Sequence, residues 1–361
     1  MLSSSDRVET KVTAAEDSAQ RRTLTGRAPH RSDHFDGRRF FNPHVRTGTS
    51  WREFLRWAVT ARPRPWPQRI ANRSRPAPPA RLAPRQLALT FVNHITFLIQ
   101  LPGLNILTDP VYSERVSPVR LIGPRRVRAP GLPFEALPPL DLVLISHDHY
   151  DHLDIDTLRR IEAAHRPRYV TGLGTGALLR RIELQRVHEL DWWQCLHLPG
   201  AGADLTFTPA QHWSGRGLFG RNRTLWGGFH VGCADGDVYF AGDTGYGTHF
   251  HEIRRRLGAP DLALLPIGAY APRWYEAANH MDPHESVQAH RDLGAAVSVA
   301  THFGCFRLSD EGFEEPLHDL AAARAHHGIP ERSFVALETG ETRHFALARF
   351  EHEALRHDAA A

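Results

Sequence analysis

The sequence has few cysteines, and their arrangement excludes two kinds of site. Among 361 residues there are three: Cys195, Cys233 and Cys305. They lie far apart and form no CxxC pair, so we expect neither a disulfide framework nor a zinc site built from thiolates. This usage suits a reducing compartment.

Excess charge and long apolar runs are absent as well. The 44 basic and 40 acidic residues leave a formal net charge of only +4, which does not indicate a nucleic-acid-binding surface. No stretch approaches the ~20 apolar residues that span a bilayer, and the N-terminal stretch lacks the apolar region of a signal peptide. We therefore expect a cytoplasmic protein, with at most peripheral contact at the inner face of the membrane.

The first 86 residues differ from the rest in composition and sequence pattern. Residues 1–35 are polar without periodicity, which predicts a disordered tail. Residues 36–86 are expected to form an N-terminal arm that contains a short amphipathic helix, "TSWREFLRWAV". A connector rich in proline and arginine follows, from Arg62 to Arg85.

The arm helix has two interpretations. Its apolar residues, Trp51, Phe54, Leu55 and Ala58, fall at helical spacing. We favour a strap packed on the main domain over a lipid-docking element, because the polar face is not densely basic.

Residues 87–350 have the pattern of one mixed α/β domain, followed by a C-terminal tail at 351–361. "LALTFVNHITFLIQLPGLNILTDP" predicts two or three strands broken at Pro102-Gly103. Short apolar strands then alternate with helical segments, the pattern of a sheet covered by helices.

A cluster of ionisable residues follows one predicted strand, in "LVLISHDHYDHLD". His147, His149 and Asp151 lie two residues apart, which places them on one side of an extended chain, and His152 adds a further imidazole. Burying so many ionisable groups without compensation would be costly. The cluster therefore predicts a metal site.

Three further strands end in the same kind of residue, at His212, Asp243 and His302. With the cluster they give five imidazoles and two carboxylates, a set that suits two zinc ions or other divalent transition metals. The expected first site is His147, His149 and His212. The expected second site is Asp151, His152 and His302, with Asp243 bridging and a position left open for water.

Several stretches carry a family resemblance. "SHDHYDHLD", "PAQHW", "FAGDTGYG" and "ATHFG", in this order, resemble the metallo-β-lactamase fold. "LNILTDPVYSERVSP", "ELDWW", "PIGAYAPRWY" and "NHMDPHESV" are similar to N-acylphosphatidylethanolamine phospholipase D and its bacterial relatives. The resemblance implies an αββα sandwich, that is, two mixed β-sheets flanked by helices, here preceded by the N-terminal arm.

The resemblance also implies roles for particular residues. It implies the same seven ligands, His280 facing the phosphodiester or the head group of the substrate, Asp109 supporting a ligand, and a homodimer. Asp151, Asp243 and His280 are the expected catalytic residues. The chain departs from the family where relatives commonly have Gly-His-Ala-Thr and it has "NHIT", from Asn93 to Thr96.

His280 also has support from the local sequence. "DPHE" predicts a helix start with Asp282 as N-cap, Pro283 in the first turn and Glu285 completing a capping box. A histidine just ahead of a helix N-terminus is well placed for an anionic phosphate.

We therefore predict a dinuclear zinc hydrolase, a phosphodiesterase of the phospholipase D type that acts on N-acylphosphatidylethanolamine-like phospholipids through a metal-bound hydroxide. A lactonase or other ester hydrolase is the closest alternative, since the same ions polarise a carbonyl. A di-iron redox enzyme is disfavoured by the imidazole-rich set. An alternative from another class is a nucleic-acid-binding protein, which would use the arginines of the connector. A scaffold that has lost catalysis has no support, because all seven ligand positions hold residues that can bind a metal.

Overall fold

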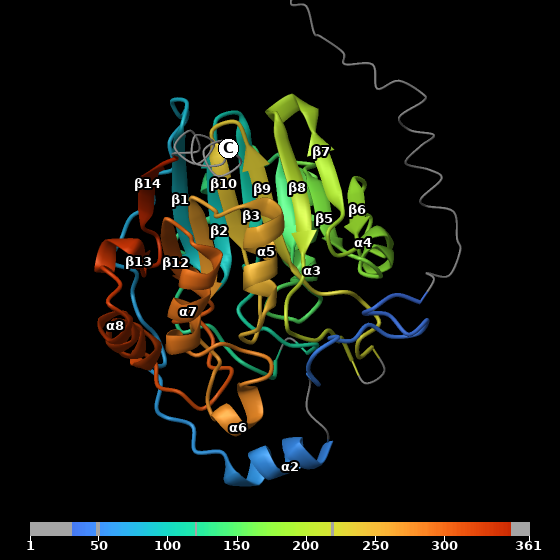
Figure 1. The fold of residues 1–361 in the computed structure, drawn as a ribbon, viewed down its shortest axis with the longest axis vertical. Coiled ribbons are helices and arrows are strands. Elements are labelled where there is room, and N and C mark those ends of the chain that lie inside the picture. Colours follow the sequence, from blue (N-terminus) through green and yellow to red (C-terminus); the bar gives the residue numbers. More distant parts are fainter. Residues whose placement is uncertain (1–30, 48–50, 120, 218–219, 348–361) are drawn as a thin grey trace, which may run out of the picture.

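The computed structural model describes residues 31–47, 51–119, 121–217 and 220–347. Within them, two β-sheets face each other and helices cover the outer faces, which confirms the predicted αββα sandwich (Figure 1). The predicted C-terminal tail, most of the predicted N-terminal tail and the side chain of Trp51 lie outside the described residues.

The first sheet has seven strands in the order β14-β1-β2-β3-β4-β5-β6. The run that was expected to hold two or three strands holds three, with turns at His94-Ile95 and at Pro102-Gly103. Pairing is antiparallel from β14 to β3 and parallel from β3 to β6. The strands are β1 (Gln86–Asn93), β2 (Thr96–Leu101), β3 (Leu104–Thr108), β4 (Leu142–Ile145), β5 (Arg168–Gly172), β6 (Val187–Leu190) and β14 (Thr342–Ala346).

The second sheet also has seven strands, in the order β13-β12-β11-β10-β9-β8-β7. It is parallel from β13 to β10 and antiparallel from β10 to β7. Its strands are β7 (Cys195–Leu198), β8 (Ala203–Thr208), β9 (Gly228–Cys233), β10 (Gly236–Phe240), β11 (Leu262–Pro266), β12 (Val297–Thr301) and β13 (Phe334–Val335).

The central strands are buried on both faces, so their sequences are almost continuously apolar. Between the sheets, Phe91 stacks on Phe97 and Phe207 packs on Phe229. Outside the first sheet, Leu158 and Ile161 join a separate apolar cluster. These layers hold the strand ends in fixed positions.

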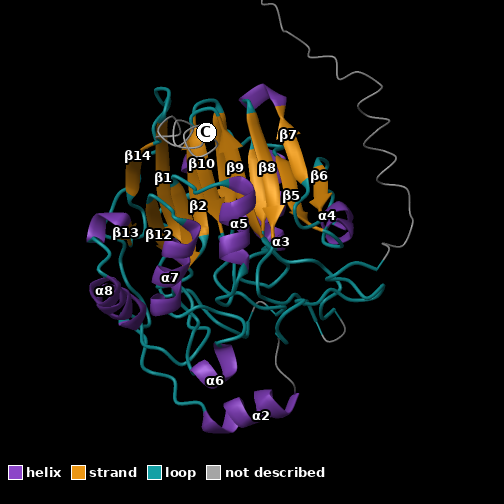
Figure 2. Ribbon diagram, viewed as in Figure 1, coloured by secondary structure: helices purple, strands orange, loops and turns teal. Residues whose placement is uncertain are grey.

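The helices form the outer layers of the sandwich (Figure 2). The cluster beyond the first sheet includes residues of α3 and α4, and the main cluster includes residues of α5, α7 and α8. These helices are α3 (Ile155–Ala164), α4 (Gly176–Arg181), α5 (His249–Leu257), α7 (Pro283–Leu293) and α8 (Glu315–His327). Short 3-10 turns occur at η1 (Phe134–Ala136), η2 (Pro199–Ala201) and η3 (Glu331–Ser333).

The strand directions bring the predicted site residues to one edge. In the first sheet β3 and β4 run parallel, and in the second sheet β8, β10 and β12 run in one sense because two antiparallel steps separate β8 from β10. The chain after each of these strands therefore emerges at the same end of its sheet. Figure 1 shows these loops gathered below the strands, on the side where α2 (Trp51–Thr60) and α6 (Arg273–Glu276) lie.

The first described residues correct the predicted extent of the tail. Residues 31–35 belong to the fold: Phe35 bridges to Ser32 and Phe40, and His34 and Phe35 are buried. The ring of His34 stacks on that of Trp192. Because the two residues are far apart in sequence, the local sequence around His34 does not predict this contact.

The predicted arm helix is present as α2, but the face that was expected to pack on the domain is exposed. Phe54, Leu55 and Ala58 all face solvent, and Trp57 is the half-buried anchor. The connector behaves as a strap instead: Trp66 Nε1 donates to Glu311 O at 2.9 Å. Within the described ranges, no helix has both the length and the apolar character needed to cross a bilayer.

Candidate metal centre

Loops that follow four strands carry the seven predicted ligands. The loop after β4 carries His147, His149, Asp151 and His152, and the other three follow β8, β10 and β12. The structure brings all seven together, namely His147, His149, Asp151, His152, His212, Asp243 and His302. Because they come from both sheets, the site closes the edge of the sandwich.

The first group consists of three imidazoles. The Nε2 atom of His147 lies 2.8 Å from Nδ1 of His149, and that Nδ1 lies 3.3 Å from Nε2 of His212. Three nitrogens thus point at one small volume. This is the arrangement that was predicted for the first ion.

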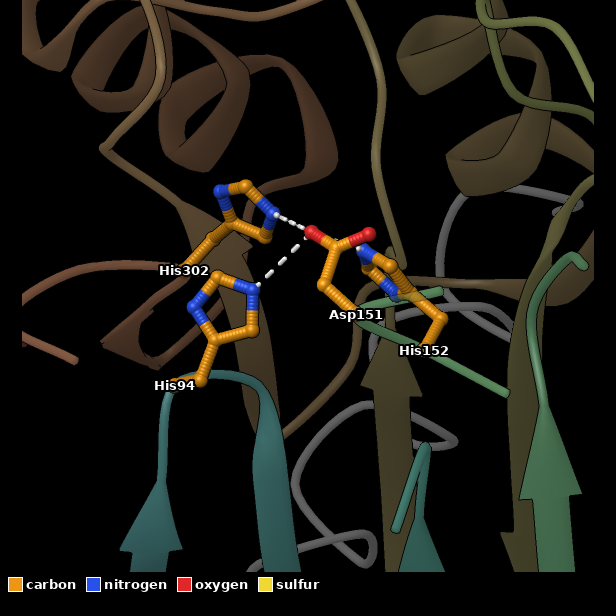
Figure 3. Close-up of side chains that lie close together, drawn as sticks. All are labelled: His94, Asp151, His152 and His302. Atoms are coloured by element: carbon orange, nitrogen blue, oxygen red, sulfur yellow. Dashed lines mark hydrogen bonds and ion pairs between the residues drawn. The ribbon is translucent and has the colours of Figure 1, made fainter. Parts of the chain in front are cut away.

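The second group mixes imidazole and carboxylate. The Oδ2 atom of Asp151 lies 3.4 Å from Nε2 of His152 and 3.4 Å from Nε2 of His302 (Figure 3). All three side chains are largely removed from solvent. They match the predicted second set.

Asp243 lies between the two groups. Its Oδ2 is 3.0 Å from His152 Nε2, 3.2 Å from His302 Nε2 and 3.8 Å from His212 Nε2. One carboxylate oxygen therefore faces members of both sets. Its position suits a bridge between two ions.

The chemistry of these atoms fits bound cations. Nε2 of His152, Nε2 of His302 and Oδ1 of Asp243 are buried and make no hydrogen bond of good geometry to any residue that the structure describes. Buried polar atoms are normally satisfied, so such a group points to something that completes it. Nitrogen and carboxylate donors at this density are the ligands of zinc and similar metals.

The imidazole pKa values shift differently in the two groups. In the first, burial lowers the pKa of His149 to about 3 and that of His212 to about 4, and the pKa of His147 falls well below its usual value. The second group differs because it holds carboxylates. Burial alone would lower the pKa of His302, but Asp243 and Asp151 outweigh it and raise that pKa to about 9.

The carboxylates respond in the opposite sense. Burial would raise the pKa of Asp243, yet the nearby His152 and His302 lower it well below its usual value. Asp151 behaves in the same way, with His152 as its main partner. The second group therefore holds negative charge that protons or a cation must balance.

Further residues hold the ligands in place. Asp109, which follows β3, lies with Oδ2 2.7 Å from His152 Nδ1, and it accepts hydrogen bonds from the amide and hydroxyl of Ser146. His212 Nδ1 lies 3.0 Å from the carbonyl oxygen of Asn279. Such contacts fix the orientation of a ligating ring.

A cavity of about 260 Å³ opens beside the seven residues. His280 borders it, 3.9 Å from Asp243 Oδ2 through its Nδ1. The predicted helix start after it is confirmed: Asp282 and Glu285 form a capping box at α7. The structure thus places His280 at the cavity, between α6 and the first turn of α7.

Three residues near this site were not selected from the sequence. Trp57 of α2 and Tyr275 line the cavity with their rings stacked at 5.5 Å. Glu276 lies with Oε2 3.9 Å from His280 Nε2, and burial, with Glu311 nearby, raises its pKa to about 8. No local signal marks Trp57 or Glu276, since both depend on how α2 and α6 fold over the loops.

His94, in the β1–β2 turn, is a fourth residue of this kind. Its Nε2 lies 3.2 Å from Asp151 Oδ2. The sequence showed only that "NHIT" departs from the family motif at its first and third positions. The family resemblance assigned no role to its histidine.

Comparison with known proteins identifies the class. A family model described as the beta-lactamase superfamily domain matches residues 104–303, more than half of the chain. The chain belongs to this superfamily and is a metal-dependent hydrolase. Among solved structures, an isothiocyanate hydrolase from Delia radicum gut bacteria has the same fold, with a TM-score of 0.58 at 22% identity over 72% of this chain and 100% of that one.

Curated relatives narrow the class and confirm the predicted resemblance. The chain is 36% identical over 268 residues to the N-acyl-phosphatidylethanolamine-hydrolyzing phospholipase D 1 of Caenorhabditis elegans, covering 71% of this chain and 75% of that one. It is 42% identical over 265 residues to an uncharacterized protein of Mycobacterium tuberculosis, covering 69% of each.

Removing metal is expected to lower thermal stability. A ligand that binds only the folded state at 100 times its Kd stabilises that state by about 2.7 kcal/mol. Melting curves of zinc-loaded, chelator-stripped and zinc-reloaded protein should show a fall in Tm and its recovery. A double variant, His147→Ala with His302→Ala, is the control and should not respond to zinc. Equal Tm values for loaded and stripped wild-type protein would contradict the metal centre.

Proposed function

We propose that the chain is a dinuclear zinc phosphodiesterase of the phospholipase D type, acting on N-acylphosphatidylethanolamine-like lipids. One observation carries the proposal: two groups of donors share Asp243 and border a cavity that His280 also lines. The relative from C. elegans supports the lipid class, since its name states that activity.

His147, His149 and His212 would hold one ion and Asp151, His152 and His302 the other, with Asp243 between them. When bound, the two ions supply Lewis-acid chemistry and make a water molecule acidic enough to attack at neutral pH. Five imidazoles and two carboxylates favour zinc over the harder ions that prefer oxygen alone.

The chain's own residues then shape the reaction. His280 is half-buried at the edge of the cavity, and its Nδ1 makes no hydrogen bond to any described residue, so this edge of its ring is available to a phosphoryl oxygen. Burial lowers the pKa of His280 well below its usual value, which favours a neutral imidazole. A hydrogen bond that is aimed where charge develops stabilises the transition state.

The position of α2 supports peripheral contact with a lipid surface. Phe54 and Leu55 are about half exposed and Val59 is 81% exposed, while Trp57 on the same helix lines the cavity. A helix that exposes apolar side chains beside the site can rest on a bilayer without crossing it. A location at the inner face of the membrane and a homodimer remain part of this proposal.

The substrate class can be tested by product analysis. Zinc-loaded enzyme should convert N-acylphosphatidylethanolamine to phosphatidic acid and an N-acylethanolamine, measured by mass spectrometry, and should be at least ~100-fold slower as Asp243→Asn because the shared carboxylate is lost. Acyl-lactones run in parallel separate the alternative activity. Turnover of lactones alone, or near-normal lipid hydrolysis by a metal-replete Asp243→Asn enzyme, would refute the proposal.

The lipid contact predicts a defect that depends on the form of the substrate. Phe54→Ser with Leu55→Ser should slow hydrolysis of lipid in vesicles and leave a soluble phosphodiester unaffected, because the change lies outside the cavity. Leu317→Ser, at an exposed apolar residue on α8, is the matched control. Equal activity of the double variant and the control on vesicles would rule out docking through α2.

A further inference from the structure

His94 occupies an unusual place for a residue outside the seven. It lies in the β1–β2 turn with only 1% of its surface exposed, and its backbone has a positive φ of 47°. Few residues other than glycine adopt this conformation without a local reason. The side chain points directly at the second donor group (Figure 3).

Two members of that group contact His94. Its Nε2 lies 3.2 Å from Oδ2 of Asp151, and its ring lies 4.1 Å from the ring of His302 between centroids. The backbone adds a third link, because His302 N donates to His94 O at 2.8 Å. The ring of Phe306 also lies edge-on to the imidazole of His94, with 5.3 Å between the ring centroids.

The turn that carries His94 is itself held firmly. Asn93 Nδ2 donates to Val111 O at 3.1 Å, and Thr96 Oγ1 donates to Asp109 O at 2.7 Å. Asp109 in turn contacts His152. One hairpin therefore supports the second group through His94 and, by way of Asp109, through His152.

His94 could serve as a ligand or as a support for one. As a ligand it would bring the second group, with Asp243, to five protein side chains, whereas catalytic sites keep a position open for water or substrate. As a support, it donates Nε2–H to Asp151 and leaves the open position intact. Nδ1 has no hydrogen-bond partner in the described part of the chain, so the Nε2–H tautomer is the one that makes a contact.

We propose that His94 is a positioning residue for the second metal site: it fixes the carboxylate of Asp151 by a hydrogen bond and packs against His302, so that both face one ion. The inference rests on the proposed metal centre. It assigns His94 to the second group alone, because in the described structure its contacts are with Asp151, His152 and His302 and not with His147, His149 or His212. Removing the hydrogen-bond donor of His94 should therefore weaken the binding of one ion and leave the binding of the other unchanged.

Two substitutions separate the hydrogen bond from the packing. His94→Phe keeps a ring against His302 and lacks the donor, while His94→Gln offers an amide N–H near the position of Nε2. His290→Phe is the matched control: His290 is also buried with one side-chain hydrogen bond, to Ser298, but it lies on α7 outside the site.

The readout is zinc titration of stripped protein by calorimetry, which resolves the two binding steps. Loss of a supporting hydrogen bond typically weakens metal binding by about 10–100-fold. We expect this loss at one site of His94→Phe, an unchanged second Kd, and recovery to within a few-fold in His94→Gln. The spectrum of the cobalt-substituted protein should change at one site only. His290→Phe should bind both ions as the wild type does.

Several outcomes would overturn the inference. Unchanged Kd values in His94→Phe, or an equal loss at both sites, would remove the positioning role. Complete loss of one ion without rescue by His94→Gln would make His94 a ligand instead. If His94→Phe does not fold, His94→Leu replaces it in the titration. Two zinc-binding steps with wild-type Kd values in His94→Leu would also refute the positioning role. Wild-type protein that binds no zinc would instead refute the proposed metal centre.

Discussion

The rest of the structure depends on the burial of two carboxylates, Asp151 and Asp243, at the edge of a dry sandwich. Their side chains are 14% and 2% exposed. An ionised carboxylate removed from water is strongly unfavourable unless positive charge is near. His152 and His302 approach them within 3.4 Å, and bound cations would complete the compensation.

This constraint explains why the donors sit on strand ends. Each ligand follows a strand whose partners fix its position, so the loops cannot move apart to relieve the repulsion among imidazoles. Further contacts tighten the arrangement: Asp109 holds His152, and the β1–β2 turn carries His94 against Asp151. The fold thus stores a preformed site, which is what a metal hydrolase requires for rapid chemistry.

Local patterns could be predicted because their causes are local. The spacing of His147, His149 and Asp151 fixes which side of the chain they share, and the capping box at Asp282 lies within four residues. The prediction of the two ligand groups depended on the residues at the strand ends and on the family resemblance. Their convergence is observed, and their role as ligands stays a proposal.

Contacts made by the tertiary fold could not be predicted in this way. His94 meets Asp151 only because β1 to β4 form one sheet. Trp57 reaches the cavity because α2 folds under α6, and the apolar face of that helix proved to be exposed rather than packed. The burial of His34 and Phe35 likewise depends on the core of the domain, so their polar surroundings in sequence were misleading.

The most direct test is anomalous diffraction from crystals grown with zinc, measured on both sides of the zinc absorption edge. The account predicts two peaks per chain, about 3.5–4 Å apart. One peak should touch His147, His149 and His212, and the other Asp151, His152 and His302, with Asp243 reaching both. A single peak, or ions bound away from these residues, would contradict it.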